Sequence, residues 1–331
     1  MTTLRGLIEQ GRAIAAHRPW PRALVDIDTW LHAINLLEKG QCTLLGLWGE
    51  KKFVHVALID AEGKDPGILS FECDEQHFPS IGRQHAPAIR LERSLRDLSG
   101  LEPEGLPDTR GWLDHGRWPV SRPLGRIAQA AGGFKPQPYQ FLAAHGESLH
   151  EIPVGPVHAG IIEPGHFRFT ASGETIVRLE ERLGYVHKGI ESLMAGQTIE
   201  RAAILAGRVS GDSTVAYALA FARAVEAAQD IEVPVRAVWL RALMAELERL
   251  ANHFGDIGAI CNDAAFAMLH AQCALLREQV LRASDTCFGH RLMMDRVLPG
   301  GVRGDLTPEC ARTLTQLLAH FRKDFPELVE L

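Results

Sequence analysis

The sequence predicts an α+β protein with a small N-terminal α/β domain, followed by a mainly helical bundle that begins with a β-hairpin. Two short runs, residues 43–48 and 53–59, alternate like strands on either side of a turn at residues 49–52. The second half instead carries long amphipathic segments from residue 213 onward. At 331 residues the chain is long enough for about two domains with their own cores.

The N-terminal domain is expected over residues 1–120. An amphipathic segment at residues 24–37 precedes the two strands, and residues 67–71 are a third strand candidate. Residues 86–98 have apolar side chains near helical spacing, which predicts a helix. This helix also carries a dense charged face, for which we expect solvent exposure and weak ion pairs. The members of that face are Arg90, Glu92, Arg93, Arg96 and Asp97.

A loop rich in proline and glycine follows at residues 100–110 and has little apolar content of its own. Such a loop has to dock against a surface, and we expect a neighbouring subunit to cover it. Residues 114–153 are rich in Pro, Gly and His without clear periodicity. We therefore place a linker at residues 121–153 and the second domain at residues 154–331.

The second domain opens with a tight loop that concentrates residue types able to move protons. His158, Glu163 and His166 lie close together there. A carboxylate and a histidine can relay protons between a buried site and solvent. Residues 166–170 and 175–179 then alternate like the strands of a hairpin.

A second polar loop, residues 207–213, leads into a long apolar helix and contains Arg208, Ser210, Asp212 and Ser213. Ser213 or Asp212 can cap this helix, whose first N–H groups suit an anion or a polarised ligand. Two interpretations are open here: a well-capped core helix, or a binding site at the start of a buried bundle. Four long helices are predicted in this half, at residues 213–228, 233–254, 264–284 and 308–320.

Composition excludes several classes of protein. The formal net charge of −6 is spread along the chain without a basic stripe, which argues against a nucleic-acid binder. No segment approaches the roughly 18 unbroken apolar residues of a membrane helix, and residues 1–20 lack the apolar core of a signal peptide. We therefore expect a cytoplasmic chain with no direct membrane span. The six cysteines contain no C-x-x-C pair, so neither a zinc ribbon nor an iron–sulfur run can be written.

Residues 82–113 (GRQHAPAIRLERSLRDLSGLEPEGLPDTRGWL) resemble the signature of the C subunit of bacterial NADH-quinone oxidoreductase. The family elements E-R-x-x-x-D-L-x-G and G-x-P-D-x-R match residues 92–100 and 105–110. In that family the domain is a docking subunit without a redox centre. The resemblance implies the same role for residues 1–120.

Four segments, in order over residues 155–302, resemble the large subunit of group 4 [NiFe] hydrogenases, such as that of formate hydrogenlyase, and the related D subunit of NADH-quinone oxidoreductase. They are GPVHAGIIEPGHFRF, LGYVHKGIE, RALMAELERLANHFGDIG and GHRLMMDRVLPGGV. A C-like domain fused ahead of a D-like one is a known arrangement in these families. The resemblance therefore covers both halves of the chain and implies a fused C/D-type subunit.

The chain also departs from these families at defined positions. Hydrogenases of this class carry C-G-x-C in the second loop, and Ser210 and Ser213 stand where its two thiolates bind nickel and iron. Neutral hydroxyls cannot replace soft thiolates, so nickel is not expected. The quinone-reductase branch has Tyr at Gly211 and histidines at Met293 and Met294, so its quinone contact is not transferred. The family's C-terminal segment has no counterpart here, and we expect a shortened or incomplete chain.

The resemblance implies roles for several residues. The family Arg equivalent to Arg208 lies near a [4Fe-4S] cluster of a small partner subunit, and the Glu equivalent to Glu163 serves proton movement. Arg208 is the only cation in residues 207–214, and we expect it to act as an uncompensated charge that stabilises the reduced cluster. We expect the catalytic residues to be Glu163, His166, Arg208 and Asp212, and the cofactor contacts to be Arg208, Ser210, Ser213 and His158.

These features lead to one functional hypothesis. The chain is expected to be a cytoplasmic subunit, peripheral on the inner face of the cell membrane, of an NADH-quinone-oxidoreductase-like or hydrogenase-related complex. It would form the wall of an electron-accepting cavity beside the partner's cluster, with quinone as a candidate ligand, and couple electron arrival to proton movement. Expected partners are a small iron–sulfur subunit and membrane-arm subunits, and the chain itself is expected to bind no cofactor directly. The alternatives are a non-catalytic assembly or scaffold subunit and, less favoured, an active [NiFe] hydrogenase.

Overall fold

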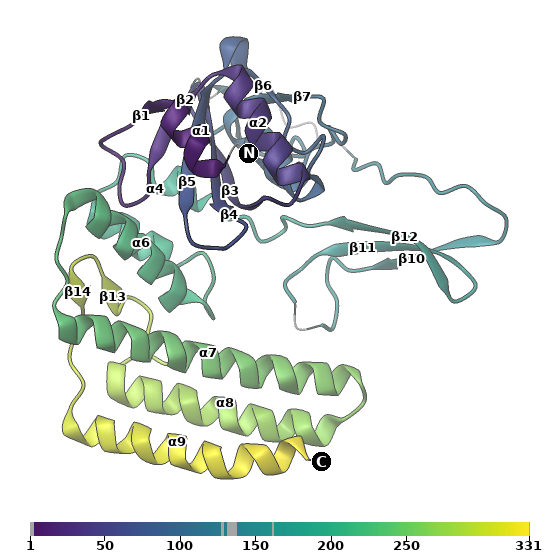
Figure 1. The fold of residues 1–331 in the computed structure, drawn as a ribbon. Helices are drawn as coiled ribbons and strands as arrows, with labels where there is room; N and C mark the ends of the chain where they lie inside the picture. The colour runs from purple at the N-terminus through teal and green to yellow at the C-terminus, as the bar shows by residue number, and fades with distance from the viewer. Residues whose placement is uncertain (1–2, 127–128, 131–137, 161, 331) are drawn as a thin grey trace. The chain divides into compact units, whose positions relative to one another are not determined.

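The computed structural model in Figure 1 describes the whole chain except residues 1–2, 127–128, 131–137, 161 and 331. Its contacts divide the chain into two units. The N-terminal unit comprises Met1–His158 and Pro164–His187, and the helical unit comprises Ala159–Glu163 and Lys188–Leu331. This division falls later in the chain than the linker expected at residues 121–153. Strands and helices both contribute, and the predicted α+β class is confirmed.

A five-stranded sheet in the order β1-β2-β5-β4-β3 forms the centre of the N-terminal unit. The strands are β1 (Arg12–Ala13), β2 (Arg22–Val25), β3 (Cys42–Glu50), β4 (Phe53–Asp60) and β5 (Pro66–Glu72). β2 pairs with β5 in parallel and the other pairs are antiparallel. The three strands predicted from alternation are confirmed as β3, β4 and β5.

Helices α1 (Leu4–Gln10) and α2 (Ile27–Glu38) pack with this sheet (Figure 1). α2 begins later than predicted because Asp26 is its N-cap, and the Asp26 carboxylate accepts the N–H of Thr29 at 2.9 Å. Trp30 of α2 is fully buried, and its indole N–H donates to the carbonyl of Pro79 at 3.1 Å. The buried face of α2 therefore fixes both the sheet and the chain beyond β5.

The helix predicted at residues 86–98 is the short 3₁₀ turn η2 (Ala86–Ala88) followed by α3 (Ile89–Ser99). Glu92 on α3 is fully buried. Its carboxylate accepts hydrogen bonds from the Ser80 hydroxyl at 2.6 Å, the Ile81 N–H at 2.6 Å and the Gly82 N–H at 3.2 Å. Burial raises the pKa of Glu92, although these bonds act in the opposite direction. The expectation of a solvated charged face is wrong for this residue.

The same helix also holds the loop that follows it. Arg93 is buried, lies over the Trp112 ring and forms an ion pair with Asp108 at 2.9 Å. Its guanidinium also donates to the carbonyl of Arg110 at 2.9 Å. Asp97 accepts the N–H groups of residues 112–114 at 2.7, 2.8 and 3.2 Å. Helix α3 therefore supplies part of the surface that fixes the Pro/Gly loop and the residues after it, and Arg110 of the loop also pairs with Glu180.

Short strands and turns complete the N-terminal unit. They are η1 (Asp74–Gln76), β6 (His77–Pro79) with β7 (Glu102–Glu104), β8 (Val120–Ser121) with β9 (Gln129–Ala130), and a sheet of β10 (Leu149–Val154), β11 (His166–Ser172) and β12 (Thr175–Arg182). The predicted hairpin is confirmed as β11–β12. All of β10 except Val154 lies in the expected linker, where Pro153 obscured the strand pattern but is tolerated on an edge strand. Residues 127–128 and 131–137 of that linker lie outside the described residues.

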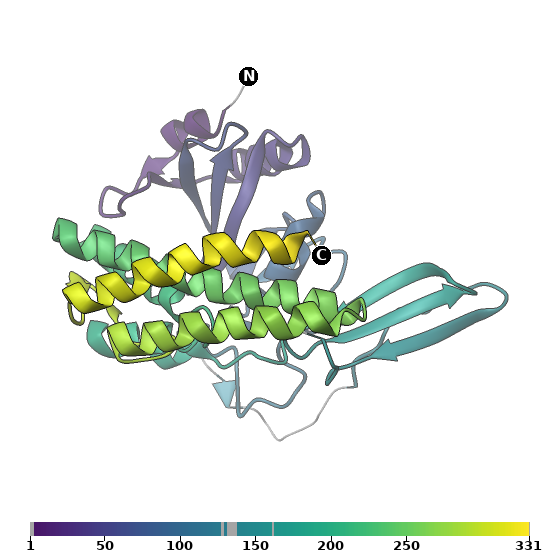
Figure 2. The same cartoon turned by 90° about the horizontal axis from the view of Figure 1, so that it is seen from below.

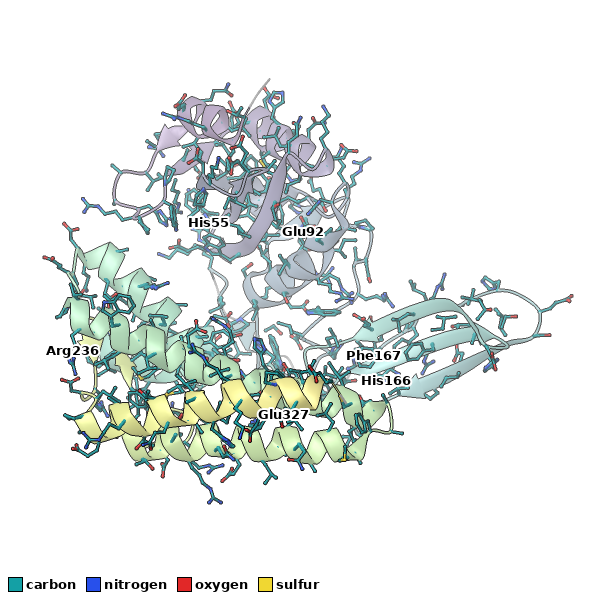
Figure 3. All side chains as sticks on the ribbon, turned by 60° about the horizontal axis from the view of Figure 1, so that its bottom comes forward. His55, Glu92, His166, Phe167, Arg236 and Glu327 are labelled. Carbon is teal, nitrogen blue, oxygen red and sulfur yellow. The ribbon has the colours of Figure 1, made fainter. Side chains whose placement is uncertain are left out.

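In its described residues the helical unit contains the four long helices that were predicted and two shorter ones. They are α4 (Ile190–Met194), α5 (Ile199–Ala206), α6 (Thr214–Gln229), α7 (Val235–Asp263), α8 (Ala267–Phe288) and α9 (Pro308–Val329). Figures 1 and 2 show α7, α8 and α9 side by side, and their facing side chains form one apolar core with α6. Arg236 at the start of α7, labelled in Figure 3, pairs with Asp305 at 2.7 Å.

A buried ion pair joins α6 to α7 and holds a small hairpin. Arg241 donates two hydrogen bonds to the carboxylate of Glu226 at 3.1 and 2.5 Å, and the side chains are only 5% and 9% exposed. Arg241 also donates to the carbonyls of Leu298 at 2.6 Å and Gly301 at 3.1 Å, in the hairpin of β13 (Val297–Leu298) and β14 (Gly301–Val302). Burial would raise the pKa of Glu226, but the bonds from Arg241 and from the Gly300 N–H outweigh it and lower that pKa.

Candidate functional site

The loop between α5 and α6 is fixed from several directions. The hydroxyl of Thr214, the first residue of α6, donates to the carbonyl of Gly207 at 2.8 Å and closes the loop on itself. Lys188 donates to the carbonyl of Val209 at 2.7 Å, and Asn252 of α7 donates to the carbonyl of Asp212 at 2.9 Å. The loop is therefore a defined surface of the helical unit, because its polar backbone groups have protein partners.

Arg208 forms a bidentate ion pair with Asp295. Its two terminal nitrogens donate to the two carboxylate oxygens at 2.9 and 2.7 Å. The hydrogen bonds from Arg208 lower the pKa of Asp295, and the same bonds raise the pKa of Arg208. The two side chains are 36% and 29% exposed, so solvent screens the pair in part. The expectation that Arg208 carries an uncompensated charge is wrong, because a fixed carboxylate neutralises it.

Asp295 comes from a turn with unusual backbone geometry. Met293 and Asp295 both have left-handed conformations, with φ of 54° and 62°. The ring nitrogen Nδ1 of His290 accepts the N–H groups of Leu292 at 3.1 Å and Met294 at 3.3 Å, which stabilises this turn. Met293, at a position where the quinone-reductase branch has a histidine, is buried in the apolar core. The turn therefore presents a carboxylate to Arg208 and uses a methionine for packing.

The start of α6 is occupied by a side chain of the protein itself. Ser213 is the N-cap residue, as predicted, but its side chain makes no capping hydrogen bond. The carboxylate of Glu248 on α7 instead accepts the N–H of Val215 at 2.7 Å and of Ala216 at 3.0 Å. Burial raises the pKa of Glu248, the two backbone hydrogen bonds act against that shift, and the nearby carboxylate of Asp212 reinforces it. The first N–H groups of α6 thus bind an internal carboxylate, which corrects the expectation that they are available to a ligand.

The hydroxyls and carboxylate of the loop do not fit the metals of the hydrogenase centre. Ser210 donates a short hydrogen bond to Asp212, so these two predicted site residues lie together. Ser210 and Ser213 offer only neutral hydroxyls, which are poor ligands for nickel or low-spin iron. Within the described ranges no group of three or more His, Cys, Asp or Glu side chains could hold a metal ion. The groups that the described loop offers are the two hydroxyls, the Asp212 carboxylate and Arg208.

The first polar loop and the first residue of β11 hold the other three predicted site residues. His166 begins β11, as Figure 3 shows, and its Nδ1 lies 3.2 Å from the carbonyl of Gly155. The His158 ring packs at 6.2 Å from the ring of Phe167, and Glu163 is exposed. His158 and His166 belong to the N-terminal unit, whereas Arg208 and the rest of its loop belong to the helical unit. A shared cavity of the two loops stays a prediction.

Three charged residues that organise this region were not predicted: Asp295, Glu248 and Arg241. A usable signal was present for two of them. Arg241 and Glu248 lie three residues before and four residues after Met244, a fully buried member of the apolar stripe. Side chains at these spacings share one helix face, so both charges had to be buried and paired. Asp295 carried no such signal, because it lies in a turn.

Comparison with known proteins identifies relatives of this chain. A family model described as nickel-dependent hydrogenase matches residues 188–255. Hydrogenase-4 component G of Escherichia coli (strain K12) is 35% identical over 268 residues, which are 78% of this chain and 48% of that protein. The C/D subunit of NADH-quinone oxidoreductase from Phocaeicola vulgatus is 26% identical over 307 residues, which are 86% of this chain and 59% of that protein. The chain thus spans about half the length of the curated relatives it matches.

A solved structure supports the fold. A chain of the membrane-bound sulfane sulfur reductase, an archaeal respiratory membrane complex, superposes with a TM-score of 0.53 at 21% identity, covering 56% of this chain and 50% of the other. In the part of the chain that the structure describes, no helix is long and apolar enough to cross a membrane. The matches confirm the resemblance drawn from the motifs: this chain is a sequence relative of hydrogenase components and of fused C/D-type subunits of NADH-quinone oxidoreductase.

Proposed function

We propose that the chain is a subunit of a membrane-associated respiratory oxidoreductase complex, related to NADH-quinone oxidoreductase and to group 4 hydrogenases. In this proposal it lies on the inner face of the cell membrane and is held there by membrane-arm subunits. It forms one wall of an acceptor cavity beside an iron–sulfur cluster of a small partner subunit, with quinone as a candidate ligand. Electron arrival at that cavity is coupled to proton movement.

The loop at residues 207–213 carries this proposal, because its motif resembles the segment that holds the reactive centre in the hydrogenase family. The loop keeps Arg208 and an acidic neighbour but presents serines in place of thiolates. Arg208 and Asp295 form a paired, partly exposed guanidinium and carboxylate. Such a pair can respond to a charge that changes on a neighbouring group without itself losing a proton.

The first experiment asks whether partners exist. The full chain, carrying an affinity tag in its native host, is expected to co-purify with a small iron–sulfur subunit and with membrane subunits. Recovery of the chain as a clean monomer from gently solubilised membranes would contradict a place in such a complex. The same purification from host cells that carry the untagged chain is the control for the procedure.

The second experiment concerns nickel. Protein produced together with the nickel-insertion machinery is expected to contain no stoichiometric nickel by elemental analysis, because Ser210 and Ser213 supply hydroxyls. The double variant Ser210→Cys/Ser213→Cys places thiols at both positions and tests whether the two hydroxyls alone prevent nickel binding. Stoichiometric nickel in the unaltered chain would establish a hydrogenase-type centre and overturn the proposed cofactor-free role.

A scaffold function without electron transfer is the second candidate. Two observations favour it: Asp295 neutralises Arg208, and Glu248 fills the start of α6. A complex that assembles normally and keeps full turnover with Arg208→Met alone would support the scaffold function.

A further inference from the structure

A buried hydroxyl on α8 has no partner of the usual kind. Ser284 is 1% exposed, and its Oγ has no hydrogen-bond partner among the residues that the structure describes. Other hydroxyls in α8 and α9 donate to the carbonyl four residues earlier, as Thr286 does to Arg282 at 3.0 Å and Thr313 to Glu309 at 3.0 Å. An unpartnered buried hydroxyl is costly, and in native proteins it usually binds water.

Ser284 lines a small cavity together with Glu248, and apolar atoms form most of its surface. The cavity has a volume of about 10 Å³, near the lower limit for one water molecule. Its polar lining residues are Asp212, Glu248, Asn252, Arg277, Ser284 and Arg291. The Ser284 hydroxyl and the Glu248 carboxylate both belong to this lining, and together they offer the two partners that a buried water needs.

A wider cleft of about 330 Å³ shares three of these walls, namely Asp212, Asn252 and Arg277. Two other residues that line the cleft, Asp256 and His270, are exposed, so the cleft reaches solvent. The solvent-exposed cleft therefore lies next to the cavity that Glu248 lines, separated from it by the side chains that the two share.

We propose that Glu248 exchanges a proton with solvent through a water molecule bound at Ser284. This inference deepens the proton-moving part of the proposed function and rests on it for its biological purpose. In the step, hydronium in the cleft gives a proton to the bound water, which passes one to a carboxylate oxygen of Glu248. The carboxylate becomes a carboxylic acid, hydronium becomes water, and no electron moves.

The charged groups around Glu248 come from each element packed against it. They are Asp212 from the loop, Arg249 from its own helix, Arg277 from α8 and Arg291 from the turn after α8. Arg291 is already paired with Glu278 at 2.7 Å. Burial raises the pKa of Glu248, and Asp212 adds to that shift, so proton uptake is favoured at a higher pH than for an exposed glutamate.

Proton uptake has a structural consequence close by. Ionised Glu248 accepts two N–H groups at the start of α6. A carboxylic acid is a weaker acceptor than a carboxylate, so protonation loosens these bonds. Since Thr214 of the same helix end closes the loop that carries Arg208, the protonation state of Glu248 is linked to the geometry of the candidate site.

The experiment is infrared spectroscopy of the purified full chain, followed as a function of pH and after transfer into heavy water. The expected result is a carboxylic acid C=O band that appears as the pH falls, at a pH above the usual glutamic acid value, and that is absent in Glu248→Gln. In heavy water the band is expected to shift at once, and Ser284→Ala is expected to slow that exchange at least tenfold. Thr286→Ala, on the same helix but with a hydroxyl already bonded to the backbone, is the matched control and is expected to leave the exchange unchanged.

Thermal unfolding of the full chain is a second test, which does not depend on the strength of the infrared band. If Ser284 binds water, Ser284→Ala is expected to lower the melting temperature, because the bound water loses a hydrogen-bond partner. A higher melting temperature in Ser284→Ala would show a dry hydroxyl and overturn the proposal, as would a band that resists exchange or does not respond to Ser284→Ala. Neither measurement uses an electron donor or a partner subunit, so the result is independent of whether the proposed electron-transfer role holds.

Discussion

Replacing Arg241 by methionine tests how the helical unit is held together. Arg241 is one half of the buried ion pair with Glu226, and it also binds two carbonyls of the β13–β14 hairpin. The Arg241→Met change keeps the length of the aliphatic stem but leaves a buried carboxylate and the carbonyls without a cationic donor. This hairpin directly follows the turn that carries Asp295.

Breaking a buried ion pair by removing one partner typically costs about 3–5 kcal/mol, because the remaining charge stays desolvated. For a unit of this size, that corresponds to a fall in melting temperature of roughly 6–20 °C, taking about 2–4 °C per kcal/mol. The sign of the pH dependence follows from Glu226. Its pKa is lowered below 4.5 in the folded state, so its stabilising effect is present above that value and is lost as the pH falls through the folded pKa.

The assay is thermal unfolding of the full chain followed by far-ultraviolet circular dichroism at several pH values. The control is Arg249→Met on the same helix, since Arg249 pairs with Glu246 at 2.5 Å but both side chains are more than half exposed. The destabilisation by Arg241→Met is expected to exceed that by Arg249→Met at neutral pH and to shrink as the pH falls below 4.5. If the two variants melt at the same temperature at neutral pH, the buried pair does not stabilise the unit and the reasoning fails.

Two further predictions concern the other charged networks. Arg208→Met is expected to lower the midpoint potential of the partner's cluster by on the order of tens of millivolts, and Asp295→Asn is expected to raise it, because the two changes remove charges of opposite sign. Redox titration of the assembled complex measures both shifts, and shifts of the same sign would exclude an electrostatic origin. Asp97→Asn is expected to increase cleavage of the loop at residues 100–110 in limited proteolysis of the full chain, because Asp97 accepts the N–H groups of residues 112–114 that follow the loop. Unchanged cleavage rates would show that other contacts fix the loop.

Much of the fold was accessible from the sequence because it depends on local patterns. Alternation at residues 53–59 and the long apolar stripe around Met244 report directly on a strand and a helix, since side-chain period follows backbone geometry. β10 was missed because Pro153 interrupts its pattern, and α5 was missed because it is only two turns long. The motifs at residues 92–100 and 105–110 identified a family, although the burial of Glu92 and Arg93 was not foreseen.

The sequence by itself determined which chemical groups the loop at residues 207–213 carries and that hydroxyls replace thiolates there. Only the tertiary structure decided their partners. Arg208 binds Asp295, which is 87 residues away in sequence, and the start of α6 binds Glu248, 33 residues beyond Val215. The physical reason is that a charge in a partly buried site is neutralised by the group that the packing of the chain places within hydrogen-bond distance. The spacing of residues within one segment does not encode how that segment packs against other helices.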